Sequence, residues 1–273
     1  MIAMIELHQV SKVFYNDENG QHVQALQEVS LEIEENEFVC LLGPSGCGKS
    51  TLLNLVAGFE QPTAGRVLFG DNPVTGPARD RGVVFQEPTL FPWLTVEQNV
   101  EFGLRNLHLG APARRRVARR CLALVGLRDF ARARPHQLSG GMKQRVALAR
   151  VLALNPRALL MDEPFGSLDA QTRDRLQDEL LRIWQVHRKT VLFVTHNVEE
   201  AVYLADRVAV LAPAPDSIIV DLPISIPRPR DRFSPEVREA TMALISVLAN
   251  LPCCVLPSQS EEARQTVRFQ EGG

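Results

Sequence analysis

Residues 43–51 read "GPSGCGKST", and this stretch decides the fold. It fits the pattern G-x-x-x-x-G-K-S from Gly43 to Ser50, which is typical of a phosphate-binding loop when a strand precedes it and a helix follows. The apolar run "FVCLL" lies directly before it, and a helical pattern comes after it. The segment therefore predicts a nucleotide-binding sheet. A glycine-rich turn that binds nothing is the weaker alternative.

The residues of this loop have distinct expected roles. Backbone N–H groups of such a loop, together with the positive end of the following helix, suit a polyphosphate. We expect Lys49 to reach the β- and γ-phosphates and the Ser50 hydroxyl to ligate Mg²⁺. Cys47 is interpreted as a small filler and not as a redox switch. The residues expected to hold the phosphates are Gly43, Ser45, Gly46, Cys47, Gly48, Lys49, Ser50 and Thr51.

Short apolar runs elsewhere predict the sheet to which this loop belongs. They are nearly continuous in apolar residues, as expected for strands buried on both faces of a parallel sheet. Open α/β sheets bind ligands at the carboxyl ends of their strands, so the last residues of these runs are candidate site residues. The runs are "FVCLLG" at 38–43, "GVVFQ" at 82–86, "ALLMDE" at 158–163 and "TVLFVTH" at 190–196.

Two carboxylates and a histidine end two of these runs. Carboxylates at the end of a buried strand are costly unless they are paired or bound to a cation. We expect Asp162 to hold Mg²⁺ through water and Glu163 to activate the attacking water as general base. An exposed acidic turn is the alternative, which the nearby phosphate loop disfavours. His196 is a candidate contact of the γ-phosphate, although a lone histidine is more often structural. Gln86 is expected to reach Mg²⁺ or the attacking water from the opposite side.

A second glycine-rich helix start lies at 138–145, "LSGGMKQR". Glycine is a poor helix former, so two glycines at a helix start suggest that something approaches the backbone closely. The helix start also suits an anion. The chain therefore has two predicted anion-binding helix starts.

The order of the predicted elements gives an α/β fold with a P-loop NTPase sheet core. The first 70 residues are rich in strand patterns, which predicts an N-terminal antiparallel β subdomain. A helical subdomain is inserted at about 87–157, and the ATP-binding domain as a whole spans 1–225. Residues 226–273 form a C-terminal extension, in which Ser234 caps a helix with Pro235 at its first position and a polar tail follows that we expect to be disordered.

Composition excludes several classes of protein. The net charge of −2 gives no global reason to expect nucleic acid as a partner. Five cysteines without a disulfide framework favour a reducing compartment. No apolar run approaches the length of a membrane span, and Glu6 and His8 interrupt any signal-peptide core. A protein of this kind that works at a membrane must dock onto another chain.

Together, the ordered motifs resemble the ATP-binding subunits of ABC transporters over about residues 4–230. The set comprises "GPSGCGKST", Gln86, "LSGGMKQR", "ALLMDEP", "GSLDA" and "VTHN", of which the "LSGG" segment is the most specific. In that family two subunits meet head to tail, with each ATP between one phosphate loop and the other subunit's signature helix. The resemblance implies that Ser139 and Gly141 bind the γ-phosphate of a second copy.

Further roles follow only from this resemblance. Asp169 is expected to link the two ATP sites across the dimer. Phe14 is expected to stack on adenine, with core packing as the alternative. Asn197 departs from the aspartate common in related importers, which puts no catalytic role in doubt.

The segment after Gln86 is similar to that of importer subunits for nitrate, sulfonates, taurine and related solutes. This similarity implies a pair of such subunits under membrane permease subunits at the cytoplasmic face of the inner membrane, supplied by a solute-binding protein. Phe91, Trp93 and Leu94 are interpreted as a docking surface for the permease, with a local core as the alternative.

A basic run, "RRRVARR" at 114–120, keeps one other class of function open. Some ABC-type ATPases act on nucleic acid or ribosomes, and a basic run can bind such partners. On a helix it is more often a solvated face, and we expect no nucleic acid partner.

Overall fold

The computed structural model describes residues 3–16, 21–215 and 218–251. The polar tail expected after the C-terminal helix lies outside the described residues.

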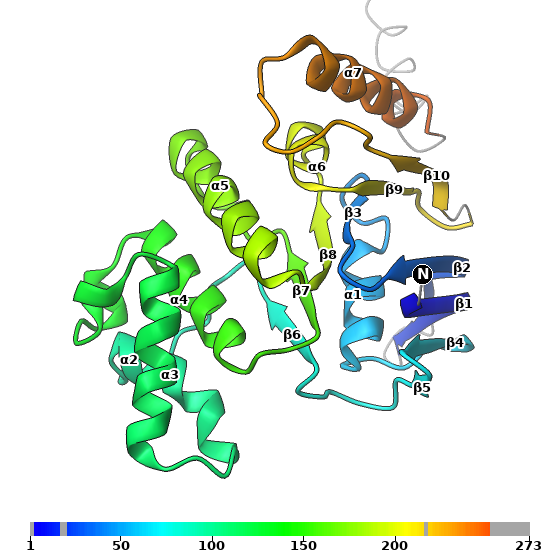
Figure 1. Cartoon of the computed structure of the whole chain (residues 1–273). Coiled ribbons are helices and arrows are strands. Elements are labelled where there is room, and N and C mark those ends of the chain that lie inside the picture. Colours follow the sequence, from blue (N-terminus) through cyan, green and yellow to red (C-terminus); the bar gives the residue numbers. More distant parts are fainter. Residues whose placement is uncertain (1–2, 17–20, 216–217, 252–273) are drawn as a thin grey trace, which may run out of the picture.

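The chain forms two sheets, with helices on both faces of the larger one (Figure 1). The smaller, antiparallel sheet has the order β2-β1-β4-β5 and the larger one the order β10-β9-β3-β8-β7-β6. The elements of the antiparallel sheet are β1 (Ala3–Asn16), β2 (Gln21–Glu34), β4 (Ala64–Phe69) and β5 (Asn72–Pro73). Those of the larger sheet are β3 (Phe38–Leu42), β6 (Arg81–Val84), β7 (Ala158–Asp162), β8 (Thr190–Thr195), β9 (Arg207–Leu211) and β10 (Ile218–Pro223). The helices are α1 (Lys49–Ala57), α2 (Val96–Phe102), α3 (Ala111–Leu124), α4 (Gly140–Ala153), α5 (Ala170–His187), α6 (Val198–Leu204) and α7 (Pro235–Ala249), with 3-10 turns at Gly103–Asn106, Arg128–Phe130 and Pro135–Gln137.

The four predicted apolar runs are parallel neighbours in the larger sheet, as expected. In β3, Val39 and Leu41 pack towards α1 and the antiparallel sheet, whereas Phe38, Cys40 and Leu42 pack towards α5 and α6. Both sets are fully buried. Because burial of each such side chain contributes about 1.5–3 kcal/mol, both faces of the strand hold the fold together.

Two strands at one edge of this sheet were absent from the sequence prediction. β9 runs parallel to β3, and β10 pairs antiparallel with β9. The segment "RVAVL" of β9 is a short apolar run like the other four, so the signal was present, whereas β10 carries a polar residue, Asp221, and ends in a proline.

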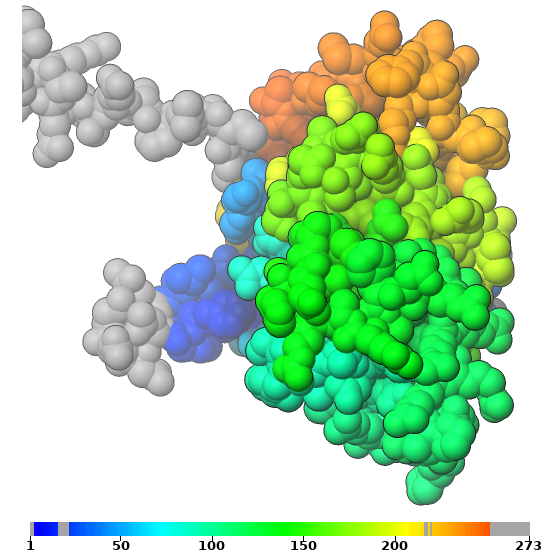
Figure 2. All heavy atoms as spheres, turned by 90° about the vertical axis from the view of Figure 1, so that its left-hand side faces the viewer, coloured from blue at the N-terminus to red at the C-terminus, as the bar shows by residue number. Residues whose placement is uncertain are grey.

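The inserted helical subdomain has its own core. Apolar residues of α2, α3 and α4 meet there, among them Val100, Leu122 and Val146. This subdomain, coloured green, fills the lower part of the face in Figure 2. On its surface Arg119 of the basic run pairs with Glu97 of α2 at 2.6 Å. An arginine that is paired with a neighbouring helix fits the interpretation of a solvated face.

The helix predicted after the core is confirmed as α7. The Ser234 side chain accepts a hydrogen bond from the Val237 N–H at 3.3 Å, and Pro235 begins the helix. Val237 and Leu244 enter the same apolar cluster as α5 and α6, and α7 lies over α6 (Figure 1). The predicted extension is therefore helical and packed on the sheet domain, which confirms the fold class.

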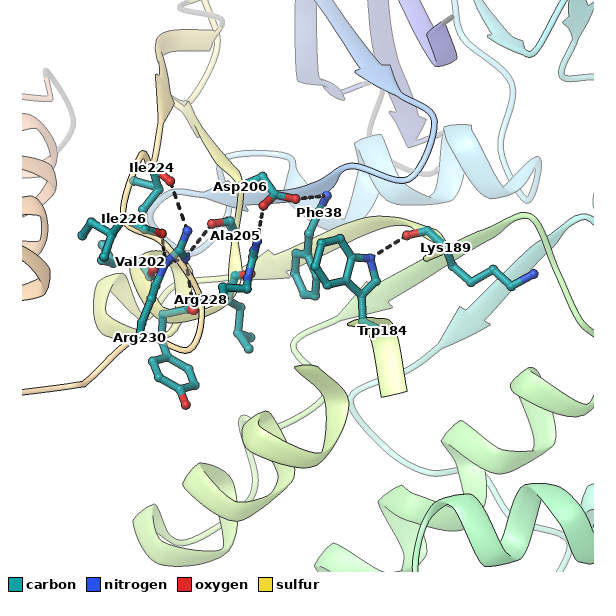
Figure 3. A network of polar contacts seen from close by, with 12 residues as sticks. Phe38, Trp184, Lys189, Val202, Ala205, Asp206, Ile224, Ile226, Arg228 and Arg230 are labelled. Atoms are coloured by element: carbon teal, nitrogen blue, oxygen red, sulfur yellow. Dashed lines mark hydrogen bonds and ion pairs between the residues drawn. The ribbon is translucent and has the colours of Figure 1, made fainter. Parts of the chain in front are cut away.

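Arginine side chains attach the segment that leads to α7. Arg230 is 5% exposed and donates to the carbonyls of Val202 at 2.7 Å and Ala205 at 2.6 Å, at the end of α6 (Figure 3). Arg228 binds Asp206 and lies over the Trp184 ring. The two bonds from Arg230 satisfy carbonyls that a helix end leaves without partners.

Candidate functional site

The phosphate-binding loop has a conformation that requires glycine at its last position. Gly48 has a φ of 99°, in the left-handed region, and a Cβ there would lie 2.4 Å from the Ala25 carbonyl oxygen. A side chain would therefore be strained and would collide with β2. The loop enters α1 directly after Gly48, which caps the helix without a side chain.

Lys49 lies folded into the loop. Its side chain is buried, and Nζ donates to the carbonyl oxygens of Gly43 and Pro44, each at 2.8 Å. The ammonium is thus held within the curve of the loop, where a cation can meet phosphate. Cys47 is also buried, and burial raises the pKa of its thiol, so it stays protonated at neutral pH as a filler would.

Ser50 and Asp162 meet across the site. The Ser50 hydroxyl donates to Asp162 Oδ1 at 3.0 Å, although the two residues come from α1 and the end of β7. Burial raises the pKa of Asp162; the hydrogen bond from Ser50 lowers it, and the charge of Glu163 raises it further. A carboxylate disfavoured by its surroundings is one that gains from a bound cation.

Glu163 and His196 form a pair at the same edge of the sheet. His196 Nδ1 lies 2.9 Å from Glu163 Oε2, and the side chains are 56% and 21% exposed. Glu163 has a φ of 42°, and its N–H donates to the Val194 carbonyl of β8 at 3.0 Å. This backbone bond ties Glu163 to β8, the strand that ends directly before His196.

Gln86 lies near this pair but not at the end of a strand. β6 ends at Val84, two residues earlier, because the Phe85 carbonyl is bound by the Gln144 side chain of α4 and the chain leaves the sheet there. A Cβ built on Gly166 would lie 3.1 Å from Gln86 Nε2 and 3.6 Å from Glu163 Oε2. Gly166 thus leaves the space in which these two side chains approach each other.

The second helix start, that of α4, has fewer partners. Ser139 is exposed and its Oγ accepts from the Met142 N–H at 3.3 Å. Gly140 and Gly141 are the first two helical residues, whose N–H groups have no carbonyl to bind within the helix. Among the described residues, Ser139 makes no hydrogen bond to the phosphate-binding loop.

Gly141 has a packing reason within the chain. A Cβ there would lie 2.6 Å from Thr172 Cγ2 of α5. The group that approaches this glycine most closely is therefore a side chain of the same molecule, which the sequence could not reveal. Asp169 caps α5 by accepting from the Thr172 N–H at 3.0 Å, and this bond is the first cause of the lowered pKa of Asp169.

Phe14 lies apart from these residues on β1. It is 38% exposed, and Lys12 Nζ lies 4.9 Å from the centroid of its ring. A half-exposed ring beside a cation is open to a stacking partner.

Aromatic side chains line a hollow between the two subdomains. Phe91 and Phe102 have ring centroids 4.3 Å apart, and Phe59 stacks with Phe85 at 6.1 Å. These four rings line a hollow of about 330 Å³. Trp93, beside Phe91, is 67% exposed. The sequence indicated Phe91 and Trp93, but not Phe59, Phe85 and Phe102, which come from other segments of the chain.

One residue that holds this region was missed in the sequence. Arg150 of α4 donates to the carbonyls of Thr89 at 3.0 Å and Pro88 at 3.3 Å. The helix that begins at Ser139 therefore ends in contact with the loop that leads to Phe91. Arginine spacing in a helix carries no signal for such a contact.

The chain is similar to known proteins over most of its length. The family model described as "ABC transporter" matches residues 26–166. The nitrate import ATP-binding protein NrtD of Synechocystis sp. is 49% identical over 223 residues, which cover 82% of this chain and 83% of that protein. The bicarbonate transport ATP-binding protein CmpD of the same organism is 47% identical over 236 residues, covering 85% and 83%.

A solved structure has the same fold. The dimeric, post-hydrolysis ATP-binding cassette MJ0796, bound to ADP and Pi, superposes with a TM-score of 0.72 at 35% identity, covering 82% of this chain and all of that one. Within residues 3–251, leaving out 17–20 and 216–217, no helix is long and apolar enough to cross a membrane.

Proposed function

We propose that this chain drives an importer for a small solute of the nitrate, sulfonate or taurine kind. The chain belongs to the ABC transporter family of ATP-binding subunits and is an ATPase of that family. The observation that carries the proposal is the gathering of Ser50, Asp162, Glu163 and His196 at one sheet edge beside Lys49. The relatives named above give no support to an ATPase that acts on nucleic acid or ribosomes.

In this proposal Lys49 binds the β- and γ-phosphates of ATP, and the loop N–H groups of residues 43–51 hold the remaining phosphate oxygens. The residues present fit Mg²⁺, since Ser50, Asp162 and Gln86 offer only oxygen ligands and Asp162 is short of countercharge. No group of three or more His, Cys, Asp or Glu side chains among the described residues could hold a metal alone, which suits an ion that keeps waters and binds phosphate. When bound, Mg²⁺ offsets charge on the phosphates.

Glu163 acts as the general base. Its Oε2 is held by His196, which leaves Oε1 to accept a proton from the attacking water. With Nδ1 donating to Glu163, a protonated His196 ring can donate from Nε2 to a γ-phosphate oxygen. Gln86, whose side chain borders the same space at Gly166 as Glu163, orients the water.

A second copy of the chain completes each ATP site. Ser139 and the N–H groups of Gly140 and Gly141 bind the γ-phosphate held by that copy, and Asp169 connects the two sites. Phe14 stacks on adenine. ATP then acts as a ligand that favours the closed pair, and hydrolysis releases it.

The permease docks in the hollow lined by Phe59, Phe85, Phe91 and Phe102, with the exposed Trp93 at its side. Large apolar side chains gathered at one surface are typical of protein–protein contacts. The chain then lies at the cytoplasmic face of the inner membrane, and a solute-binding protein delivers the solute to the permease.

Capture from membranes tests this assembly. Tagged Glu163→Gln chain with ATP, recovered from gently solubilised membranes of its own cell, should bring an integral membrane subunit in near-equal amount. Adding Trp93→Ser should reduce this recovery while leaving ATP binding intact. Recovery with ribosomes or DNA would overturn the transport function and leave the ATPase chemistry standing.

A further inference from the structure

A buried carboxylate lies beneath His196. Glu200 of α6 is 5% exposed, and it accepts hydrogen bonds from the Thr195 hydroxyl at 2.5 Å and from Gln177 Nε2 at 2.8 Å. Gln177, on α5, is also buried, and its Oε1 accepts from Arg232 Nη1 at 2.6 Å. A chain of polar contacts therefore runs from the segment before α7 to the end of β8.

The direction of each bond in this chain is fixed by chemistry. A guanidinium only donates, so the amide oxygen of Gln177 must face Arg232 and its NH₂ group must face Glu200. Glu200 accepts this bond and the one from the Thr195 hydroxyl. Since Thr195 donates to Glu200, its oxygen is left to accept the Asn197 N–H at 3.0 Å. Reversing any one bond would leave two donors or two acceptors facing each other.

These bonds hold the residues on either side of His196. Thr195 precedes it and Asn197 follows it, and the Asn197 side chain in turn accepts from the Glu200 N–H at 3.1 Å. His196 itself carries the contact to Glu163. Glu163, His196, Thr195 and Glu200 line one small cavity. The position of the imidazole therefore depends on groups that do not touch the nucleotide.

The series of polar contacts that begins at Thr195 ends at Arg232, in the segment before α7. Arg232 also donates to Asp178 at 2.9 Å and lies 3.4 Å from the centroid of the Tyr203 ring. Its neighbours Arg228 and Arg230 anchor the same segment at other places, on Asp206 and on the carbonyls at the end of α6 (Figure 3). Arg232 is thus the one of these three anchors that is bonded to Gln177.

We propose that Glu200 is a positioning residue for His196, and that ATP turnover depends, through Gln177, on the contact that Arg232 makes there from the segment before α7. The inference rests on the proposed role of His196 in hydrolysis. A misplacement of about 1 Å of a group that acts in the transition state can cost up to about 10²-fold in rate, whereas ATP affinity depends mainly on the phosphate-binding loop around Lys49.

The first experiment measures kcat and KM for ATP in the full-length chain with Glu200→Ala, Glu200→Gln and Thr195→Val. We expect Glu200→Ala and Thr195→Val to lower kcat by about 10-fold with KM changed by less than about 2-fold. Glu200→Gln should restore kcat to within about 3-fold of the native value, because its amide can donate to the Thr195 oxygen and accept from Gln177. If Glu200→Ala fails to fold, Thr195→Val still removes the hydrogen bond between Thr195 and Glu200 with little change of side-chain shape.

Each outcome has a distinct meaning. Native kcat in both Thr195→Val and any folded Glu200→Ala chain would overturn the positioning role, provided that His196→Ala lowers kcat. If His196→Ala leaves kcat unchanged, the proposed role of His196 fails, and the inference fails with it. A loss of kcat in Glu200→Gln equal to that in Glu200→Ala would also overturn it.

The second experiment compares two anchors of the same segment. Arg232→Leu should lower kcat by about 3-fold or more. In a chain that already carries Gln177→Leu, adding Arg232→Leu should lower kcat no further. Arg228→Leu, which loosens the segment at Asp206 without touching Gln177, is the matched control and should leave kcat near the native value. Equal losses of kcat in Arg228→Leu and Arg232→Leu would overturn the claim that the segment before α7 acts through Gln177 and Glu200.

Discussion

The two glycine-rich helix starts, at α1 and at α4, differ in what the chain itself supplies. At α1 the loop carries a buried lysine, and Ser50 meets Asp162 from another strand. At α4 Ser139 caps the helix, and Gly141 packs on Thr172 of α5. The same local chemistry thus has several side-chain partners from the same molecule at α1 and few at α4. This difference is the physical basis for expecting a second copy.

The largest expected effect concerns Glu163, on the α1 side of this comparison. Glu163→Gln removes the carboxylate proposed as the base but keeps a side chain of the same shape beside His196, so ATP hydrolysis should fall by roughly 10²-fold or more while ATP binding persists. Steady-state phosphate release and equilibrium binding of labelled ATP measure the two quantities. Glu199→Gln, at an exposed position on α6, is the control and should keep native turnover. Near-native turnover in Glu163→Gln would remove this residue as the base.

The next effect sharpens the difference between the two glycines of α4. Gly141→Ala places a Cβ 2.6 Å from Thr172 Cγ2, so α4 and α5 must move apart, which should lower the free energy of unfolding by about 1–3 kcal/mol. Urea unfolding without nucleotide measures it. Gly140→Ala is the matched control, because its Cβ would lie 3.6 Å from Leu168 Cδ2, an ordinary contact, and alanine favours helix. Equal stability of the two variants would show that the packing against Thr172 does not matter.

The smallest effect tests whether the α1 site is built for a cation. Burial raises the pKa of Asp162 in the folded chain above its ordinary value of 3.8. The resulting loss of stability is absent below the ordinary value, grows as the pH rises from there to the folded pKa, and is complete above the folded pKa. Asp162→Asn keeps an oxygen for Ser50. It should therefore unfold at higher urea than the native chain at pH 7 without Mg²⁺ or nucleotide, with the gain shrinking towards acid pH.

Mg²⁺ with ATP should reverse this order, because the native carboxylate gains a cation that the amide binds poorly. Asp129→Asn, at an exposed position, is the control and should show neither effect. A native chain that is more stable than Asp162→Asn at pH 7 without ligands would contradict the assigned pKa direction.

Much of the fold was predictable because strands buried on both faces must be apolar throughout, and because their ends meet at one edge. That reasoning anticipated the neighbourhood of Asp162, Glu163 and His196. The polar contacts that join Glu200, Gln177 and Arg232 were not predictable, since Gln177 lies 23 residues from Glu200 and 55 from Arg232 along the chain. No periodic pattern joins polar residues at such separations. The packing reason for Gly141 was hidden in the same way, because it depends on how α5 lies against α4.

The most direct test of the central claim, that the start of α4 completes a site on another copy, is the mass of the Glu163→Gln chain in solution with and without ATP. We expect the mass to rise from 30.4 kDa to twice that value when ATP is added. Adding Ser139→Arg should keep the chain at 30.4 kDa, whereas Ser246→Arg on the exposed face of α7 should not. A dimer that persists with Ser139→Arg, or a Glu163→Gln chain that binds ATP and stays monomeric, would contradict the shared site.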